Sequence, residues 1–291
     1  MRLLDYWPHA AVVLIVVLAI GDVILIRSGF QQYRDEAELP PGELVCGISH
    51  ESLASGRIPA NFLGGRDDRV RVDGADHPWS AIGVVFTPAS QCSGTLIGDR
   101  LVLTAGHCFP GLAEGRYDAS DVWFLAGVTD RSAAAESRAE KIYISPGFRE
   151  GQAGRPQADW ALVLLDRPLG DEVGTLAVAD PAVADAALAS GARLVQAGYS
   201  ADQPFHLTAH IGCSATILGD QGWFTHDCDV LPGDSGSPIM AEIDGVPQLV
   251  GVTTDIFCIG SRGADGGAAA AVAAFWPALP RTPVPATVSR P

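Results

Sequence analysis

The sequence predicts an all-β domain. Its apolar runs are short, turn-forming residues separate them, and the 291 residues include 33 Gly and 20 Pro, which interrupt long helices. Such a pattern is typical of a β-sandwich or a β-barrel, and by itself it does not choose between them. Near the C-terminal end, Gly267–Trp276 is rich in Ala and is expected to form a helix, although its glycines weaken that prediction. The strand candidates are Ala81–Phe86, Gly94–Ile97, Leu101–Thr104, Val122–Leu125, Ala161–Leu165, Leu194–Ala197, Ser214–Leu218, Ile239–Ile243 and Leu249–Thr253.

The N-terminal segment is apolar and predicts export. Ala10–Ile20 is an unbroken apolar run, which Val23–Ile26 nearly extends to the length of a membrane span. We expect an uncleaved hydrophobic helix, a signal anchor at residues 8–26 that could hold the chain to a membrane. The alternative is a cleavable signal peptide with Ala19 and Gly21 near the cleavage site. Either reading places the rest of the chain in the periplasm or outside the cell.

Four segments follow from composition. Residues 1–27 form the export segment, 28–57 a polar stem or pro-segment, 58–279 the folded domain, and 280–291 a Pro-rich tail. The formal net charge is −15, which disfavours nucleic acid as a partner because binding a phosphate backbone needs a basic face.

The most informative motif is Gly233-Asp234-Ser235-Gly236-Ser237-Pro238. A Ser between small residues allows a sharp turn that exposes its hydroxyl. The same turn directs the amides of Gly233 and Ser235 towards one point, which offers a nucleophile together with an oxyanion hole. Alone, this motif is a weak signal, because Gly and Ser are common in ordinary turns.

Two further segments supply the partners that a serine nucleophile needs. Leu103–Cys108 contains His107 as a candidate general base, and Asp159 stands at the head of the apolar run Ala161–Leu165. The base takes the serine proton, and an acid must orient the imidazole and stabilise its charged form. Asp166 is the rival acid, but it ends the apolar run at what reads as an exposed turn, so Asp159 is preferred.

In the order His, Asp, Ser these segments resemble those of the chymotrypsin clan of serine peptidases. The resemblance covers Phe62–Leu279, and it implies two six-stranded antiparallel β-barrels with the active site between them. It also implies that His107 and Asp159 come from the first barrel and the nucleophile Ser235 from the second. Three stretches are similar to the bacterial glutamyl-endopeptidase branch: Gly65–Val72, His77–Ile82 and Cys92–Gly98.

The resemblance implies a serine endopeptidase that cleaves proteins or peptides through an acyl-enzyme intermediate, without a metal or organic cofactor. No C-x-x-C pair is present, which disfavours a zinc site. We expect a monomer. Two alternatives remain open: an esterase that uses the same triad, and a catalytically silent peptide-binding module on a peptidase fold. The chain order excludes an α/β-hydrolase.

Six cysteines are compatible with three disulfides in an oxidising compartment. The family carries a disulfide at the spacing of Cys92 and Cys108, beside the histidine. Cys213 and Cys228 are expected to form a second disulfide that braces the specificity-pocket side. Elimination leaves Cys46 with Cys258, although sequence alone does not fix the connectivity.

The sequence indicates the substrate specificity less clearly than it indicates the catalytic residues. Glutamyl endopeptidases read the substrate carboxylate with a His on the strand after the nucleophile and a hydroxyl residue five positions before it. Thr253, which Thr254 follows, stands at the first position and Val230 at the second, and both departures weaken glutamate specificity. Asp229 falls where trypsin keeps its pocket-floor carboxylate, so the pocket prediction leaves open a basic-residue preference and a structural role for Asp229.

Asp234 raises the question of activation. Trypsin-type enzymes have Asp at this position, where it pairs with an α-amino group made by cleavage of a zymogen. Cleavage after Arg57 would free Ile58 for that role; the alternative is an internal arginine such as Arg69. A buried carboxylate without any cationic partner would be costly.

Overall fold

The structure is a computed structural model and describes residues 28–29, 32, 44–45, 48–49, 66–130, 132–150, 155–219, 222–258 and 264–280. The predicted N-terminal helix, the Arg57–Ile58 bond and Cys46 lie outside these residues, as does the tail from residue 281. Within them, no helix has both the length and the apolar character needed to cross a bilayer.

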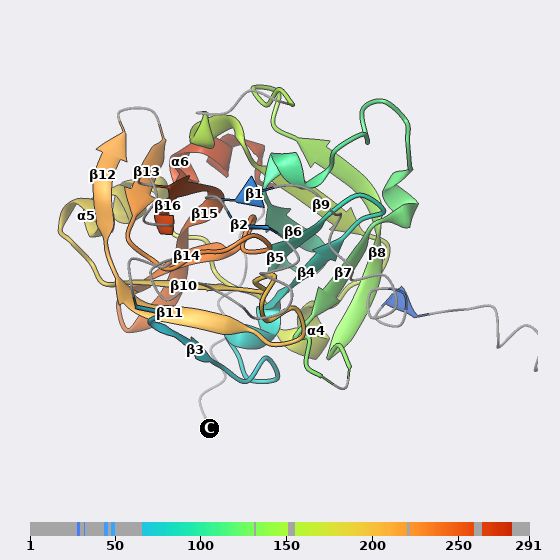
Figure 1. Cartoon of the computed structure of the whole chain (residues 1–291), viewed down its shortest axis with the longest axis horizontal. Coiled ribbons are helices and arrows are strands. Elements are labelled where there is room, and N and C mark those ends of the chain that lie inside the picture. The colour runs from blue at the N-terminus through green and yellow to red at the C-terminus, as the bar shows by residue number, and fades with distance from the viewer. Residues whose placement is uncertain are drawn as a thin grey trace, which may run out of the picture.

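The first half of the described chain closes into an antiparallel barrel, which lies on the right of Figure 1. Its six strands pair in the cyclic order β4-β5-β6-β9-β8-β7. Apolar side chains fill its interior, and all five residues of β4 are buried. The strands are β4 (Ile82–Phe86), β5 (Gln91–Gly98), β6 (Leu101–Thr104), β7 (Trp123–Ala126), β8 (Ala135–Ile144) and β9 (Ala161–Leu165).

The second half forms an eight-stranded sheet in the order β12-β13-β16-β15-β14-β10-β11-β3, on the left of Figure 1. Only Ser214 separates β11 from β12, so one bent strand contributes to two positions in this sheet. Counting β11 and β12 once leaves six strands in addition to the edge strand β3. The strands are β3 (Arg69–Arg71), β10 (Leu194–Gly198), β11 (Thr208–Cys213), β12 (Ala215–Gly219), β13 (Trp223–His226), β14 (Pro238–Ile243), β15 (Val246–Cys258) and β16 (Ala264–Ala271). The predicted all-β, chymotrypsin-like fold is thereby confirmed. Of the two predicted barrels, the first is closed, whereas the described strands of the second half form an open sheet, a half-barrel.

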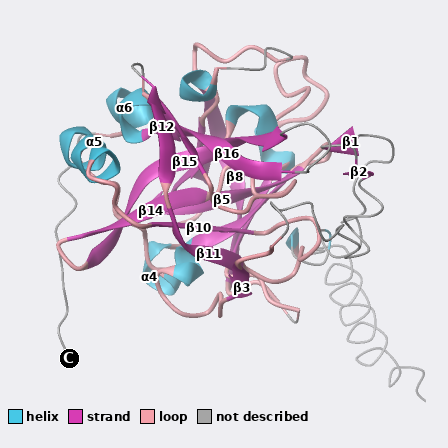
Figure 2. Cartoon of the chain, turned by 60° about the vertical axis from the view of Figure 1, so that its left-hand side comes forward, coloured by secondary structure: helices cyan, strands magenta, loops and turns pink. Residues whose placement is uncertain are grey.

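Helices are short and lie at the periphery of the strands, as Figure 2 shows. The prediction of a helix over Gly267–Trp276 is wrong for its first half, because Gly267–Ala271 belong to β16, where Gly267–Ala270 pair with both β13 and β15; the second half is helical, in α6 and the start of η6. The α-helices are α4 (Gly170–Val173), α5 (Pro181–Ala189) and α6 (Val272–Phe275). Single 3-10 turns are η1 (Trp79–Ala81), η2 (Gly106–Cys108), η3 (Ala119–Asp121), η4 (Pro156–Ala158) and η6 (Trp276–Ala278), and a two-stranded hairpin pairs β1 (Leu44–Val45) with β2 (Ile48–Ser49).

Candidate active site

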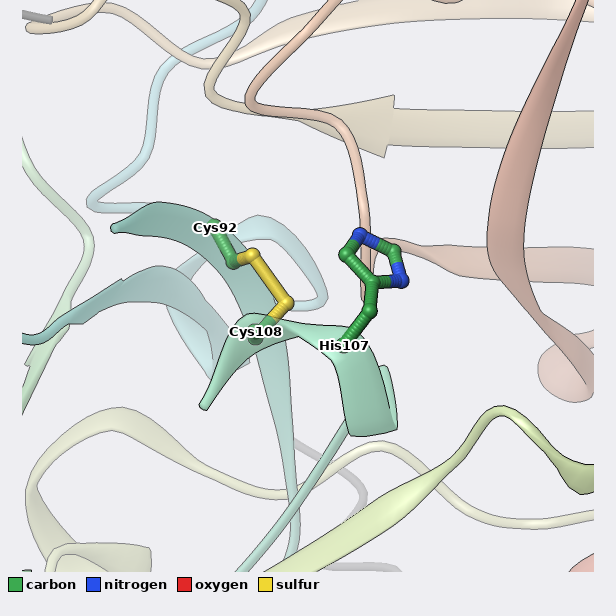
Figure 3. A group of neighbouring side chains, drawn as sticks. All are labelled: Cys92, His107 and Cys108. Carbon is green, nitrogen blue, oxygen red and sulfur yellow. A yellow bond between two sulfur atoms is a disulfide. The ribbon is translucent and has the colours of Figure 1, made fainter. Parts of the chain in front are cut away.

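His107 is held at the end of β6, on the single turn η2. A disulfide joins its neighbour Cys108 to Cys92 on β5, and Figure 3 shows the imidazole beside that disulfide. Gly106 leaves room for a close approach, since a Cβ there would lie 3.1 Å from Asp159 Oδ1. The local structure therefore anchors the His107 backbone and leaves its ring free to reach other groups.

Asp159 lies between η4 and β9 and makes two contacts with His107. Its Oδ2 is 2.7 Å from His107 Nδ1, and its Oδ1 accepts the His107 backbone N–H at 2.8 Å. The first contact places the ring proton on Nδ1 and leaves Nε2 able to accept a proton. The rival acid Asp166 lies elsewhere, where its Oδ1 accepts a hydrogen bond from Ser137 Oγ at 2.6 Å.

The charges around His107 favour its imidazolium form. Burial, the largest effect, opposes a charge on the ring. The hydrogen bond and the charge of Asp159, together with the charge of Asp255, outweigh burial and raise the pKa of His107 above its ordinary value of 6.5. The site thus stabilises the protonated base that forms when a serine hydroxyl gives up its proton.

Ser235 lies on a tight turn between two glycines with positive φ, Gly233 at 94° and Gly236 at 83°. Three amides of this turn have acceptors: Asp234 N donates to Leu231 O, Gly236 N to Thr253 O, and Ser237 N to Asp234 O. Among the described residues, the amides of Gly233 and Ser235 have no acceptor. These two amides are the ones predicted to form an oxyanion hole.

The Ser235 turn is attached directly to the first barrel. Ser93 N on β5 donates to Ser235 O at 2.8 Å, and Ser93 Oγ donates to Gly233 O at 2.8 Å. Gly236 lies so close that a Cβ there would overlap Thr104 Oγ1, at the end of the strand that leads to His107. The fold therefore brings the three segments of the predicted triad to one junction between the barrel and the eight-stranded sheet.

Asp234 is buried and only partly satisfied. Its Oδ2 accepts hydrogen bonds from Ser200 Oγ and Leu231 N, both at 2.8 Å, whereas its Oδ1 has no partner among the described residues. Burial raises the pKa of this carboxyl to about 6, against the opposing charge of Arg69. Arg69 itself is bonded to Asp67 and Asp202, with each closest N–O distance at 2.9 Å.

Three of the predicted pocket residues are buried: Val230, Thr253 and Thr254. Thr253 Oγ1 is 3.0 Å from Ser237 Oγ, which donates to it, and Thr254 Oγ1 donates to a carbonyl of β16, that of Ala268. Both threonine hydroxyls are therefore engaged within the protein.

Asp229, the fourth predicted pocket residue, has a backbone partner. Its Oδ2 accepts the N–H of Asp68 at 2.7 Å, which ties the segment before β3 to the loop before the nucleophile. Its own N–H donates to His210 Nδ1 at 2.9 Å. The hydrogen bond and charge of its carboxylate raise the pKa of His210, because protonation would turn Nδ1 into a donor towards Asp229 Oδ2, 3.4 Å away.

Two clusters of the described residues gather three possible metal-ligand atoms within 4.8 Å of one another. In the cluster of Cys92, His107 and Cys108, both sulfur atoms are already joined in the disulfide (Figure 3). In the cluster of Asp68, His210 and Asp229, the hydrogen bonds described above already use one oxygen of Asp229 and Nδ1 of His210.

The second predicted disulfide, Cys213–Cys228, is also present and joins the bend between β11 and β12 to the residues after β13. The pairing expected of Cys46 and Cys258 concerns side chains outside the described part of the chain. Two residues that the sequence did not single out belong to the site: Ser93, which bridges the barrels, and Asp255, whose charge acts on His107. Ser93 follows the first cysteine of its motif, but nothing local signals its contact with the distant Ser235 turn.

The chain is similar in sequence and in fold to known proteins. The family model for Trypsin matches residues 68–278. A glutamyl endopeptidase of Bacillus licheniformis is 30% identical over 112 residues, which cover 38% of this chain and 34% of the relative. Seminase of Drosophila melanogaster is 34% identical over 94 residues, which cover 32% of each chain. The matches thus span about a third of these curated relatives.

A solved structure also resembles this chain in its fold. The structure of a Glu endopeptidase in complex with MPD superposes with a TM-score of 0.59 at 25% sequence identity, covering 73% of this chain and 95% of that one. Because the family model matches well over half of the residues, this chain belongs to the trypsin family of serine peptidases and is related to the glutamyl endopeptidases.

Proposed function

We propose that this protein is an exported serine endopeptidase that uses Ser235 as nucleophile, His107 as general base and Asp159 as orienting acid. The observation that carries the proposal is the pair of contacts between His107 and Asp159, with the Ser235 turn bonded to the same barrel. Two disulfides among the described residues support export to an oxidising compartment.

In the first half of the reaction, His107 Nε2 accepts the Ser235 hydroxyl proton while Oγ attacks the peptide carbonyl carbon. The carbonyl oxygen becomes an oxyanion, and the amides of Gly233 and Ser235 are free to donate to it. Removing one such donor typically reduces turnover by ~10²–10³. His107 then gives the proton to the leaving amine, the C–N bond breaks, and an ester of Ser235 remains.

In the second half, water attacks this ester. His107 takes a proton from the water as its oxygen bonds to the acyl carbon, and it returns the proton to Ser235 Oγ when the ester bond breaks. Asp159 remains ionised throughout and stabilises the imidazolium in both halves. No step requires a group beyond the chain, the substrate and water.

The contacts of Asp229 support a structural role more than a direct reading of basic residues. One of its oxygens accepts the Asp68 amide and so holds the segment before β3 in place. Thr253 lies at the position of the histidine in glutamyl endopeptidases, and its hydroxyl accepts from Ser237. Selection for glutamate by an imidazole at this position is therefore not part of the proposal.

Activation by cleavage after Arg57 is also proposed. Asp234 Oδ1 is buried without a partner among the described residues, and the guanidinium of Arg69 bonds to two other carboxylates instead. A new α-ammonium group at Ile58 would supply the missing donor and a compensating charge. N-terminal sequencing of active enzyme tests this; full activity in a chain with Arg57→Gln that remains uncut would reject it.

The test of the catalytic proposal is labelling by a fluorophosphonate probe followed by digestion of a peptide library. We expect the wild-type chain to react at Ser235 and to cleave internal peptide bonds, and Ser235→Ala to do neither. Ser237→Ala is a matched control, because it removes a buried hydroxyl two residues away. Labelling without peptide cleavage but with ester hydrolysis would favour an esterase, and no labelling would favour a silent peptide-binding module.

A further inference from the structure

Strand β15 carries the chain past the Ser235 turn and on towards an acidic residue, Asp255. Gly236 N donates to Thr253 O at 2.8 Å, and Thr253 N donates to Ser237 O at 2.9 Å. These two bonds fix the position of Thr253 beside the nucleophile. Asp255 follows only two residues later, so it lies within the neighbourhood of the proposed reaction.

A bulge in β15 sets the position of Asp255. Thr253 pairs with Ala269 and Asp255 with Ala268, so Thr254 is an extra residue on this strand. Thr254 is buried, and its hydroxyl donates to Ala268 O. Bulges of this kind change the direction of the side chains that follow them and are frequent beside active sites.

The partner strand brings Asp255 near the His107–Asp159 pair. Strand β16, which pairs with Asp255, packs against η4, the turn that immediately precedes Asp159. In agreement with this placement, burial and the negative charge of Asp159 raise the pKa of Asp255, while His107 acts in the opposite direction. Asp255 therefore lies near enough to the catalytic pair for its charge to act on His107.

The carboxylate of Asp255 differs from the other acidic groups of the site because it has no hydrogen-bonding or ionic partner in the part of the chain that the structure describes. Asp159 and Asp229 accept hydrogen bonds from His107 and Asp68, and Asp234 accepts two more. Within the described ranges, Asp255 has no hydrogen bond or ion pair, and its residue is only half-buried. A partly desolvated carboxylate in this situation favours a cationic partner.

We propose that Asp255 determines specificity by binding a Lys or Arg side chain of the substrate, at a residue adjacent to the one whose carbonyl Ser235 attacks. His107 must stand beside the bond that is cleaved. The strand that carries Asp255 is bonded to the Ser235 turn, and the charge of Asp255 acts on His107, so this carboxylate is placed beside a neighbouring side chain of the substrate. This inference rests on the proposed endopeptidase function and names its substrate class.

The test is a set of fluorogenic peptides that share one residue at the cleaved bond and vary the adjacent residue on its acyl side among Arg, Lys, norleucine and Glu. Wild-type enzyme is expected to cleave the Arg and Lys peptides with kcat/KM at least roughly tenfold above the norleucine peptide, the size typical of a contact with a charged group. The Glu peptide should be the poorest substrate.

Asp255→Asn should reduce the preference for Arg and Lys to within about threefold of norleucine, mainly by lowering kcat/KM for the cationic peptides. Asp244→Asn is the matched control, because it removes the same charge from the exposed turn at the far end of the β14–β15 hairpin. Asp255→Lys should reverse the order and favour Glu. Added salt should weaken the preference of the wild-type enzyme.

The outcomes distinguish a failure of the role of Asp255 from a failure of the endopeptidase function. Efficient cleavage of the norleucine peptide by wild-type enzyme with no gain for Arg or Lys would overturn the role of Asp255 and leave the endopeptidase proposal intact. An unchanged preference in Asp255→Asn would do the same. Cleavage of none of the peptides, together with no fluorophosphonate labelling, would reject both. If Asp255→Asn does not fold, the salt dependence of the wild-type preference decides.

Discussion

The burial of the His226 side chain leads us to predict that this protein loses stability in mild acid. The residue is 2% exposed on β13, and neither ring nitrogen has a hydrogen-bond partner among the described residues. Phe224 lies edge-on to its ring, with centroids 6.3 Å apart. Burial, with a smaller effect from the charge of His210, lowers the pKa of His226 from 6.5 to about 3. The folded state therefore keeps this ring neutral.

The sign of the effect follows from proton uptake. Below pH 6.5 the unfolded chain protonates His226 while the folded chain does not, so the free energy of unfolding decreases as pH falls from 6.5 towards about 3. At ~pH 4.5 the gap of about two pH units corresponds to a loss of about 3 kcal/mol from this residue alone. That loss is a substantial share of the stability of an ordinary domain.

The assay is urea unfolding at several pH values, followed by tryptophan fluorescence in a Ser235→Ala background that prevents self-digestion. His226→Leu and His226→Asn both remove the titrating group, and each has its own packing cost, which does not depend on pH. We expect the difference in unfolding free energy between each variant and the parent to shift by about 3 kcal/mol in favour of the variant between neutral pH and ~pH 4.5.

Subtracting the unfolding free energy of the parent from that of the variant also removes an opposing contribution, which comes from Asp234. The pKa of Asp234 is raised to about 6, so the folded state takes up a proton before the unfolded state does, and Asp234 adds stability as pH falls from 6 to 3.8. Asp234 is present in every variant, so its contribution to the unfolding free energy cancels in the difference. A variant-minus-parent difference that stays constant with pH would refute the argument for His226.

Three other predictions concern the site. Asp159→Asn should lower kcat by ~10⁴ with little change in KM, measured on any good peptide substrate. The raised pKa of His107 means that kcat/KM should increase with pH through a midpoint above 6.5. Asp255→Asn should move that midpoint down, because it removes a negative charge that raises the pKa of His107. A midpoint unmoved in the variant would contradict the electrostatic coupling between Asp255 and His107. Asp229→Asn keeps an acceptor for the Asp68 amide and should retain activity and thermal stability, whereas Asp229→Ala should lose both; loss of Arg cleavage in Asp229→Asn alone would instead indicate a pocket-floor charge.

Sequence was most informative where an apolar run ends at a turn. Leu101–Thr104 and Ala161–Leu165 are strands with the predicted bounds. By contrast, β8 was not predicted, because its charged residues alternate with buried ones and the run looks polar when read linearly.

The Ala-rich segment of β16 shows why local propensity fails. Alanine is the strongest helix former, yet pairing on both sides with β13 and β15 holds Ala268–Ala270 extended in the core. Only the tertiary structure supplies that information.

In the site, motifs indicated His107, Asp159 and Ser235 because each belongs to a short pattern of residues. The hydrogen bond from Ser93 to Ser235 and the charge interaction of Asp255 with His107 could not be read in the same way, since each joins segments more than a hundred residues apart. The unpartnered oxygen of Asp234 likewise becomes evident only when the surrounding groups are located.

The hydrogen bonds from Ser93 to Ser235 and Gly233 have a mechanical consequence. They fasten the reactive turn, which belongs to the eight-stranded sheet, to a strand of the barrel, so any hinge-like separation of the two halves must first pull the alcohol and its flanking amides out of alignment. Heat or denaturant should therefore inactivate the enzyme as soon as these two hydrogen bonds break, while the barrel and the sheet still retain their own strands.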